Sequence, residues 1–97
     1  MKRIYISGPI TGTMNYLKRF EDAERELIKK GYTSIVNPAE VAMHLPDDFA
    51  HSEYIRVSLA ELECCDAIYM LQGWKNSKGA LEEFAAARRA GIEIIYQ

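Results

Sequence analysis

The stretch "NSKGALEEF", residues 76–84, places two neighbouring carboxylates just after a glycine-containing turn. Ser77 and Gly79 stand where a helix is expected to begin, and Glu82 and Glu83 follow at its start. A carboxylate near a helix N-terminus interacts favourably with the helix dipole, so solvated capping residues are the simpler interpretation. A carboxylate that faces a pocket can instead act as a nucleophile in covalent catalysis. The spacing alone leaves both interpretations open.

The two glutamates must point in different directions, because neighbouring residues of a helix project about 100° apart. Three side chains are expected to form the inward face of this helix: Leu81, Phe84 and Ala85. Glu83 then lies on the flank with Ala80 and Ala87, whereas Glu82 falls farther from the glycines of the preceding loop. The pattern therefore favours Glu83 as the carboxylate that leans over a crevice.

Two loops are rich in glycine, "SGPITGT" at 7–13 and "QGWKNSKG" at 72–79. Glycine lets backbone N–H groups approach a ligand closely, and the helix N-terminus at Ser77 and Gly79 suits a phosphate or a carboxylate. Neither loop has the spacing of a P-loop or of a dinucleotide-binding fingerprint. Anion binding and simple turn formation are equally good explanations of these glycines.

The periodicity of the apolar residues locates the elements that must position these loops. Strands are predicted at about residues 2–6, 32–36, 66–71 and 92–96, and helices at about 14–30, 52–64 and 79–90. A weaker pattern at 39–50 predicts a surface loop. Ser52 is expected to cap the second helix, and Gly31 and Gly91 to end the first and the last.

This alternation of strands and helices predicts a single α/β domain over residues 1–97, with a parallel sheet between helices. Right-handed crossovers leave few topologies, among which we favour a three-layer, flavodoxin-like or Rossmann-like fold with the strand order 2-1-3-4. Such sheets bind ligands beyond the carboxyl ends of the strands, where the direction of winding reverses. That point lies between the first and third strands, so the two glycine-rich loops flank the expected site.

The composition narrows the classes of function. The 97 residues are 48% hydrophobic with a formal net charge of −2, which indicates a soluble globular protein. This charge argues against a nucleic-acid polymer or an anionic membrane as partner, since both attract a basic excess. Without a signal peptide or a long apolar run, the sequence predicts a cytoplasmic protein.

The cysteines and histidines give little reason to expect a cofactor. Cys64 and Cys65 are adjacent, which argues against a disulfide between them and predicts buried thiols at a helix end. His44 and His51 show no metal-ligand spacing relative to this pair. We therefore expect neither a metal nor an organic cofactor.

Four blocks of the sequence carry a resemblance to a known family: "IYISGPITG", "NPAE", "CDAIYMLQGW" and "SKGALEEFAAA". In this order and spacing, the chain resembles the nucleoside 2-deoxyribosyltransferase superfamily, especially its small bacterial and phage members. The resemblance covers nearly the whole chain. It implies an enzyme that transfers a sugar from a nucleoside or nucleoside 5′-monophosphate to water or to another base. It also implies assembly into homodimers or larger homo-oligomers.

The resemblance assigns roles to particular residues. The nucleophile that attacks the anomeric carbon of the sugar corresponds to Glu83, and it would form a covalent glycosyl intermediate. Ser77 matches a serine that contacts the 5′-phosphate in the related deoxynucleotide N-hydrolases. Together with the residues singled out in the loops and after the second strand, the candidate substrate-binding residues are Ser7, Gly8, Pro9, Thr11, Gly12, Asn37, Ser58, Ser77 and Gly79.

Three positions depart from the pattern of the family. Ser58 stands where the enzymes usually carry an aspartate that assists the leaving base or orients the sugar, and a serine is no general acid near neutral pH. Glu61, one helical turn onward, can substitute for it. Pro9 and Thr11 replace a serine and an arginine of the hydrolases. These departures keep two alternatives open: a module that senses or sequesters a nucleotide without efficient turnover, and a structural protein with a vestigial cleft.

Two aromatic residues near the expected site also have two interpretations each. Tyr5 can reach the crevice or fill the core, and Trp74 can stack on a base or pack against a neighbouring subunit. The sequence does not distinguish between them.

Overall fold

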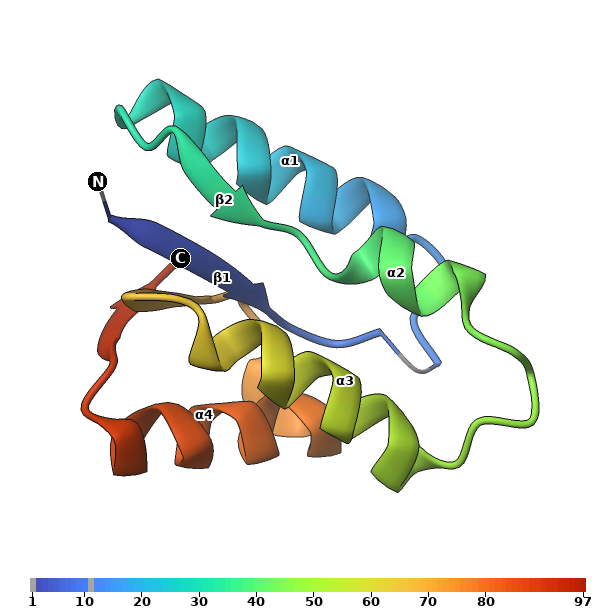
Figure 1. The fold of residues 1–97 in the computed structure, drawn as a ribbon. Coiled ribbons are helices and arrows are strands. Elements are labelled where there is room, and N and C mark those ends of the chain that lie inside the picture. Colours follow the sequence, from blue (N-terminus) through green and yellow to red (C-terminus); the bar gives the residue numbers. More distant parts are fainter. Residues whose placement is uncertain (1, 11) are drawn as a thin grey trace.

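A four-stranded parallel sheet forms the middle layer of the molecule (Figure 1). The computed structural model describes residues 2–10 and 12–97. The strands are β1 (Arg3–Ser7), β2 (Ser34–Val36), β3 (Ala67–Met70) and β4 (Glu93–Tyr96). They are paired in the order β2-β1-β3-β4, and every pair is parallel. The predicted fold class and strand order are therefore confirmed.

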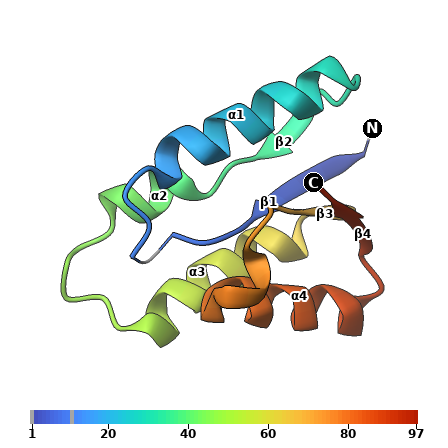
Figure 2. The same cartoon turned by 180° about the vertical axis from the view of Figure 1, so that it is seen from behind.

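Helices cover both faces of this sheet. They are α1 (Tyr16–Lys29), α2 (Ala39–His44), α3 (His51–Glu63) and α4 (Lys78–Ala90), with a short 3₁₀ turn η1 (Trp74–Asn76) before the last. Figures 1 and 2 show α1 and α2 on one side of β1, and α3 and α4 on the other. This arrangement gives the three layers that right-handed crossovers require.

The central strands alternate their side chains between the two helix layers. Ile4 and Ile6 of β1 join the core cluster under α1, whereas Tyr5 between them joins the cluster under α3 and α4. All three side chains are fully buried. A strand covered on both faces is apolar at successive positions, which explains the unbroken apolar run of the sequence here.

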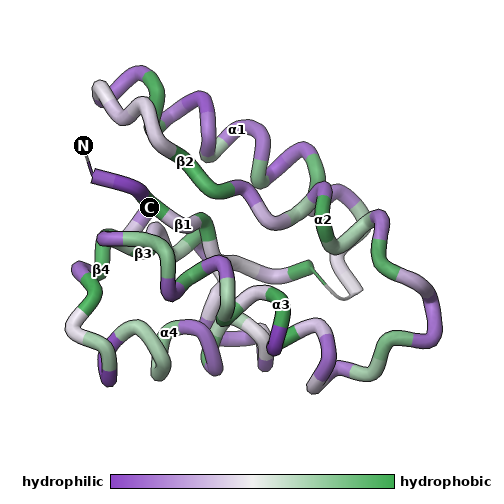
Figure 3. The backbone as a smooth tube through the Cα atoms, in the orientation of Figure 1, coloured by the Kyte–Doolittle hydropathy of each residue, from purple (hydrophilic) through white to green (hydrophobic). Residues whose placement is uncertain are grey.

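Helix α1 occupies the range that the sequence predicts, and it is amphipathic. Phe20, Ala23 and Leu27 are buried on one face, and Tyr16 packs against the same cluster. Figure 3 shows the hydrophilic and hydrophobic segments alternating along this helix. Gly31 follows its end with φ of 99°, a left-handed conformation that favours glycine.

Helix α4 begins and ends where the sequence predicts, but its inward face differs from the prediction. The Ser77 side chain accepts a hydrogen bond from the Ala80 amide, with 3.2 Å between the two atoms. The buried residues are Ala80, Glu83 and Ala87. Leu81 is 43% exposed, so placing it on the inward face was wrong. The small side chains let α4 lie close to the sheet, and Glu83 becomes part of the buried face.

The segment between β2 and α3 also differs from its prediction. Six residues of the expected loop form α2, which begins at the buried Ala39. Helix α3 begins at His51, one residue before the expected cap at Ser52. Glu53 caps the start of this helix instead, because its carboxylate accepts a hydrogen bond from the backbone amide of Ala50 at 2.8 Å. A helix as short as α2 has too little periodicity to be recognised in the sequence.

The two thiols at the end of α3 lie in different environments. Cys65 is buried and Cys64 is exposed, and both are free. The prediction of buried thiols is therefore right for Cys65 and wrong for Cys64. Within the described residues, no helix is both long enough and apolar enough to cross a membrane.

Candidate active site

A cleft of about 950 Å³ lies at the carboxyl end of β1, between α2 and α3. Residues of the loop after β1 and of the start of α4 line it. Its volume lies in the range of small-molecule sites. The cleft therefore occurs where the reversal of winding between β1 and β3 predicts it, flanked by the two glycine-rich loops.

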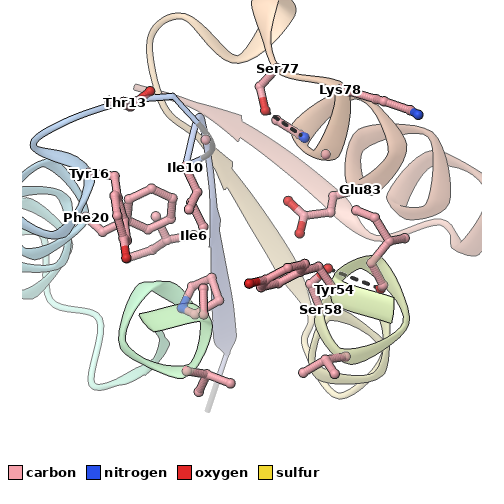
Figure 4. Close-up of a pocket in the computed structure, with 18 of the residues that line it drawn as sticks. Ile6, Ile10, Thr13, Tyr16, Phe20, Tyr54, Ser58, Ser77, Lys78 and Glu83 are labelled. Carbon is pink, nitrogen blue, oxygen red and sulfur yellow. Dashed lines mark hydrogen bonds between the residues drawn. The ribbon is translucent and has the colours of Figure 1, made fainter. Parts of the chain in front are cut away.

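Glu83 contributes a buried carboxylate to this cleft. The residue is 7% exposed, and its two oxygens have different hydroxyl donors. Tyr5 Oη donates to Oε2 at 2.7 Å, and Ser7 Oγ donates to Oε1 at 2.6 Å. Both donors come from β1 and are two residues apart, so their side chains lie on the same face of the sheet. Figure 4 shows the Glu83 side chain extending from α4 into the cleft. The strand thus fixes the orientation of the carboxylate.

Burial and hydrogen bonding act in opposite directions on Glu83. Burial raises its pKa above the usual 4.5, and the bonds from Ser7 and Tyr5 offset part of that rise. Burial also raises the pKa of Tyr5 well above 10.0, helped by the neighbouring Glu83 charge. The Tyr5 hydroxyl therefore stays protonated near neutral pH and remains a donor.

Helix α3 forms the wall opposite Glu83. Ser58 and Tyr54 extend from it toward the cleft (Figure 4). The Ser58 hydroxyl donates to the carbonyl oxygen of Ile55 at 3.2 Å, and it also contributes to lowering the pKa of Glu83. Glu61, one turn along the same helix, lines the cleft as well. Two acidic side chains thus share this end of the site.

The other half of the cleft is apolar. Figure 4 shows Ile6, Ile10, Tyr16 and Phe20 gathered on the α1 side of β1. Helix α2 and the residues beside it complete this wall with Pro38, Val41, Ala42 and Leu45. A flat aromatic group fits between such side chains, whereas a charged group does not.

The rim near the start of α4 is polar. Ser77, Lys78 and Gly79 line it, together with Gly12 and Thr13 of the facing loop. On its outer side, the imidazole of His51 forms a 2.9 Å contact with the carboxylate of Glu82, which ties α3 to α4. In the described part of the chain, no group of three or more histidine, cysteine, aspartate or glutamate side chains is arranged to hold a metal ion.

Most of the predicted site residues are brought together here. Those that line the cleft are Gly8, Gly12, Ser58, Ser77, Gly79 and Glu83, and Ser7 reaches it through its bond to Glu83. Pro9 instead lies beside Gly73, outside the lining. Thr11 lies outside the described residues.

Asn37 is engaged away from the cleft. Its side-chain Nδ2 donates to the Glu24 carboxylate at 3.0 Å, and its side-chain oxygen Oδ1 accepts a hydrogen bond from the backbone amide of Ala39 at 3.1 Å. These bonds connect the end of β2 to α1 and start α2. The neighbouring Pro38 is the residue of this segment that lines the cleft.

Gly8 has a packing role that the sequence does not reveal. A Cβ atom at this position would lie 2.9 Å from the Cβ of Leu71, which is closer than such atoms approach. Glycine therefore lets the end of β1 run against the end of β3. The requirement holds whether or not a ligand contacts the loop.

The two aromatic residues left open by the sequence have different positions. Tyr5 both fills the core and reaches Glu83, so the two interpretations are compatible. Trp74 stacks on Phe84 with ring centroids 4.5 Å apart and is absent from the lining of the large cleft. Tyr16 and Phe20 of α1 line the cleft as well, which the sequence did not predict.

Comparison with known proteins places the chain in one family. The profile of a family described as a domain of unknown function, DUF4406, matches residues 2–96. A search of curated proteins found no match.

Proposed function

We propose that the chain, which belongs to the DUF4406 family, is an N-glycosidase or a deoxyribosyltransferase. Its substrate would be a nucleoside or a nucleoside 5′-monophosphate. The observation that supports this most is the carboxylate of Glu83, which is buried, oriented by two hydroxyls and part of a cleft large enough for a nucleoside. A buried acid in a cleft is unfavourable for folding alone, and such groups often have a chemical role.

In the proposed reaction, a carboxylate oxygen of Glu83 attacks the anomeric carbon of the sugar. The bond between that carbon and the base nitrogen breaks, and the base leaves with the electron pair. The sugar is then held as an ester of Glu83, which divides one difficult displacement into two easier steps. Water or a second base attacks the same carbon and restores the carboxylate. Tyr5 and Ser7 keep the carboxylate aimed throughout.

The two halves of the cleft suggest how such a substrate would lie. The apolar half beside Tyr16 and Phe20 suits the flat base. The polar rim at Ser77 and Lys78 suits the 5′ end of the sugar, with or without a phosphate. In Figure 4, Glu83 lies below Ser77 and Lys78 and across β1 from Tyr16 and Phe20, so a substrate that spans the two regions would pass its carboxylate.

The proposal is tested by incubating the purified protein with a panel of nucleosides and deoxynucleotides and measuring free base by chromatography. We expect the wild type to release base from at least one of them, and Glu83→Gln to lower the rate by at least about 1000-fold. Glu82→Gln is the matched control, because this neighbouring glutamate does not line the cleft. Equal rates for the wild type and Glu83→Gln would exclude the proposed nucleophile.

A binding module without turnover is the second candidate. Ser58 favours it, because the hydroxyl at this position cannot protonate a leaving base and already donates to a backbone carbonyl. This alternative predicts tight nucleotide binding by calorimetry, with no free base after prolonged incubation. A chain with a vestigial cleft predicts neither binding nor a shift in melting temperature.

A further inference from the structure

A second carboxylate belongs to the cleft. Glu61 lies one helical turn after Ser58 on α3, so both side chains project from the same side of that helix. Both residues line the cleft, as does Glu83 on the facing helix α4. Glu61 is half-buried, whereas its neighbour Glu63 is exposed. The carboxyl group of Glu61 is therefore turned toward the site rather than toward open solvent.

Glu61 differs in its partners from three other glutamates of the chain, none of which lines the cleft. Glu24, Glu26 and Glu82 each interact with the side chain of another residue through their carboxylates. Within residues 2–10 and 12–97, no such hydrogen bond or salt bridge engages the Glu61 carboxylate. Its proton or its charge is therefore available to a molecule in the cleft.

The surroundings divide the two carboxyl groups into an acid and a base. Burial, followed by the charge of Glu83, raises the pKa of Glu61. Glu83 receives two hydroxyl donors that stabilise its charged form, and Glu61 receives none of them. Burial raises the pKa of both carboxyl groups, but hydrogen-bond donors favour the charged form, so the two hydroxyls favour Glu83 as the ionised partner and Glu61 as the proton carrier. Besides Glu83, two titratable groups lie close enough to Glu61 for its charge to raise their pKa: Tyr5 of β1 and Cys65 after α3.

We propose that Glu61 is the general acid of the glycosyl transfer, in place of the missing acid at position 58; this inference rests on the proposed function. As Glu83 bonds to the anomeric carbon and the carbon–nitrogen bond breaks, the proton of Glu61 passes to the departing base. In the second step, Glu61 takes a proton from the attacking water or incoming base while the Glu83 ester bond breaks and its electron pair returns to Glu83. Both carboxyl groups end as they began.

The test compares two leaving groups in Glu61→Gln, a substitution of nearly the same size. One substrate is the deoxynucleoside that the wild type cleaves fastest, whose base needs a proton to leave. The other is 4-nitrophenyl 2-deoxyriboside, whose nitrophenolate leaves without one. We expect Glu61→Gln to slow the first by at least about 100-fold and the second by only a few-fold. With the first substrate, the rate of the wild type should fall toward high pH as Glu61 loses its proton, and this fall should be absent in Glu61→Gln.

The controls separate the possible failures. Glu63→Gln changes an exposed acid of the same helix and should leave both rates unchanged. Melting curves show whether Glu61→Gln remains folded, and Glu61→Asp, which retains an acid, should recover part of the nucleoside rate. Equal slowing of both substrates, or of neither, overturns the role of Glu61 alone. If the wild type cleaves neither substrate, the proposed function fails and the role of Glu61 fails with it.

Discussion

The same strands form both faces of the sheet, but the side chains at the carboxyl ends of the strands have different partners on the two faces. Toward α1, β1 presents Ile4 and Ile6, which pack into an apolar cluster with Phe20 and Leu27. Toward α3 and α4, the same strand presents Tyr5, whose ring is in the core while its hydroxyl binds a carboxylate. One face is closed by apolar packing, and the other ends in a polar network beside the cleft.

This difference separates what holds the fold together from what can perform chemistry. Apolar burial stabilises a fold without further conditions, whereas a buried carboxylate lowers stability unless donors satisfy it. Glu82 shows that a glutamate in this helix can remain near solvent and contact His51 instead. The burial of Glu83 is therefore a feature of the site, and the apolar clusters on the two faces of the sheet supply the stability that tolerates it.

The largest effect on stability is expected on the α1 face. Leu27→Ala removes a fully buried side chain and should lower the free energy of unfolding by about 2–5 kcal/mol. Below its melting temperature, the variant should release base at the wild-type rate. Denaturant titration and the base-release assay check both statements. Ser58→Ala on the other face should lower the free energy of unfolding by about 1 kcal/mol or less. A larger decrease for Ser58→Ala than for Leu27→Ala would contradict the proposed difference between the two faces.

The next largest effect is expected from the tyrosine on the polar face. Tyr5→Phe removes the donor to Glu83 Oε2 and should lower kcat/KM by about 10- to 100-fold, the scale of a hydrogen bond to a charged group. Because this bond lowers the pKa of Glu83, the acidic limb of the pH–rate profile should move to higher pH.

A matched tyrosine on the opposite face provides the control. Tyr69 of β3 donates to Glu26 at 3.1 Å on the α1 side, away from the cleft. Tyr69→Phe should change kcat/KM by no more than a few-fold and leave the profile in place. Similar losses in both variants would show that the two faces do not differ in the way described.

A smaller effect is expected when an acid is restored at position 58. Ser58→Asp should raise base release a few-fold, because the position faces the cleft but Glu61 already supplies a proton. In the Glu61→Gln background the same change should raise the rate further. Steady-state rates of the four proteins form a double-mutant cycle that measures this coupling. An equal change in both backgrounds would mean that the two positions act independently.

The smallest effect concerns the pH dependence of stability. The pKa of Glu83 is higher in the folded chain than the usual 4.5, so the folded state keeps this proton longer than the unfolded state as pH rises. The contribution of Glu83 to the free energy of unfolding is fully present at pH values below its pKa in the unfolded chain. It is lost as the pH rises through the pKa of Glu83 in the folded chain. Glu83→Gln lacks this loss, so its melting temperature relative to the wild type should increase between about pH 4 and pH 8. A constant difference would contradict the raised pKa.

The sequence predicts much of the fold because the signals are local and periodic. Phe20, Ala23 and Leu27 recur at helical spacing, and Gly31 and Gly91 mark the ends of two helices. The crossover rule then leaves few topologies, and the favoured order 2-1-3-4 is the one observed. Helix α2 was missed because its six residues are too few to show a helical period. The side-chain oxygen of Asn37 accepts the amide of Ala39 at the start of this helix, and the sequence pattern did not indicate this bond.

The site was less accessible to sequence reasoning because its geometry is tertiary. The spacing indicates that Glu83 and Glu82 diverge, but the burial of Glu83 depends on how closely α4 lies on β1. The donors Tyr5 and Ser7 are 78 and 76 residues away from Glu83 in the chain. No local pattern reports such a pairing. Within the described residues the Glu61 carboxylate has no side-chain partner, and this too depends on the tertiary structure rather than on a local pattern.

The most direct test of the central claim is to trap the sugar on the protein. A 2-deoxy-2-fluoroarabinosyl nucleoside slows the second step, so the covalent intermediate should accumulate and be visible by mass spectrometry. We predict a single fluorosugar adduct on the peptide that contains Glu83, formed together with one equivalent of free base and absent in Glu83→Gln. Release of base with an adduct on another residue, or with no adduct, would contradict the assignment of Glu83 as the nucleophile.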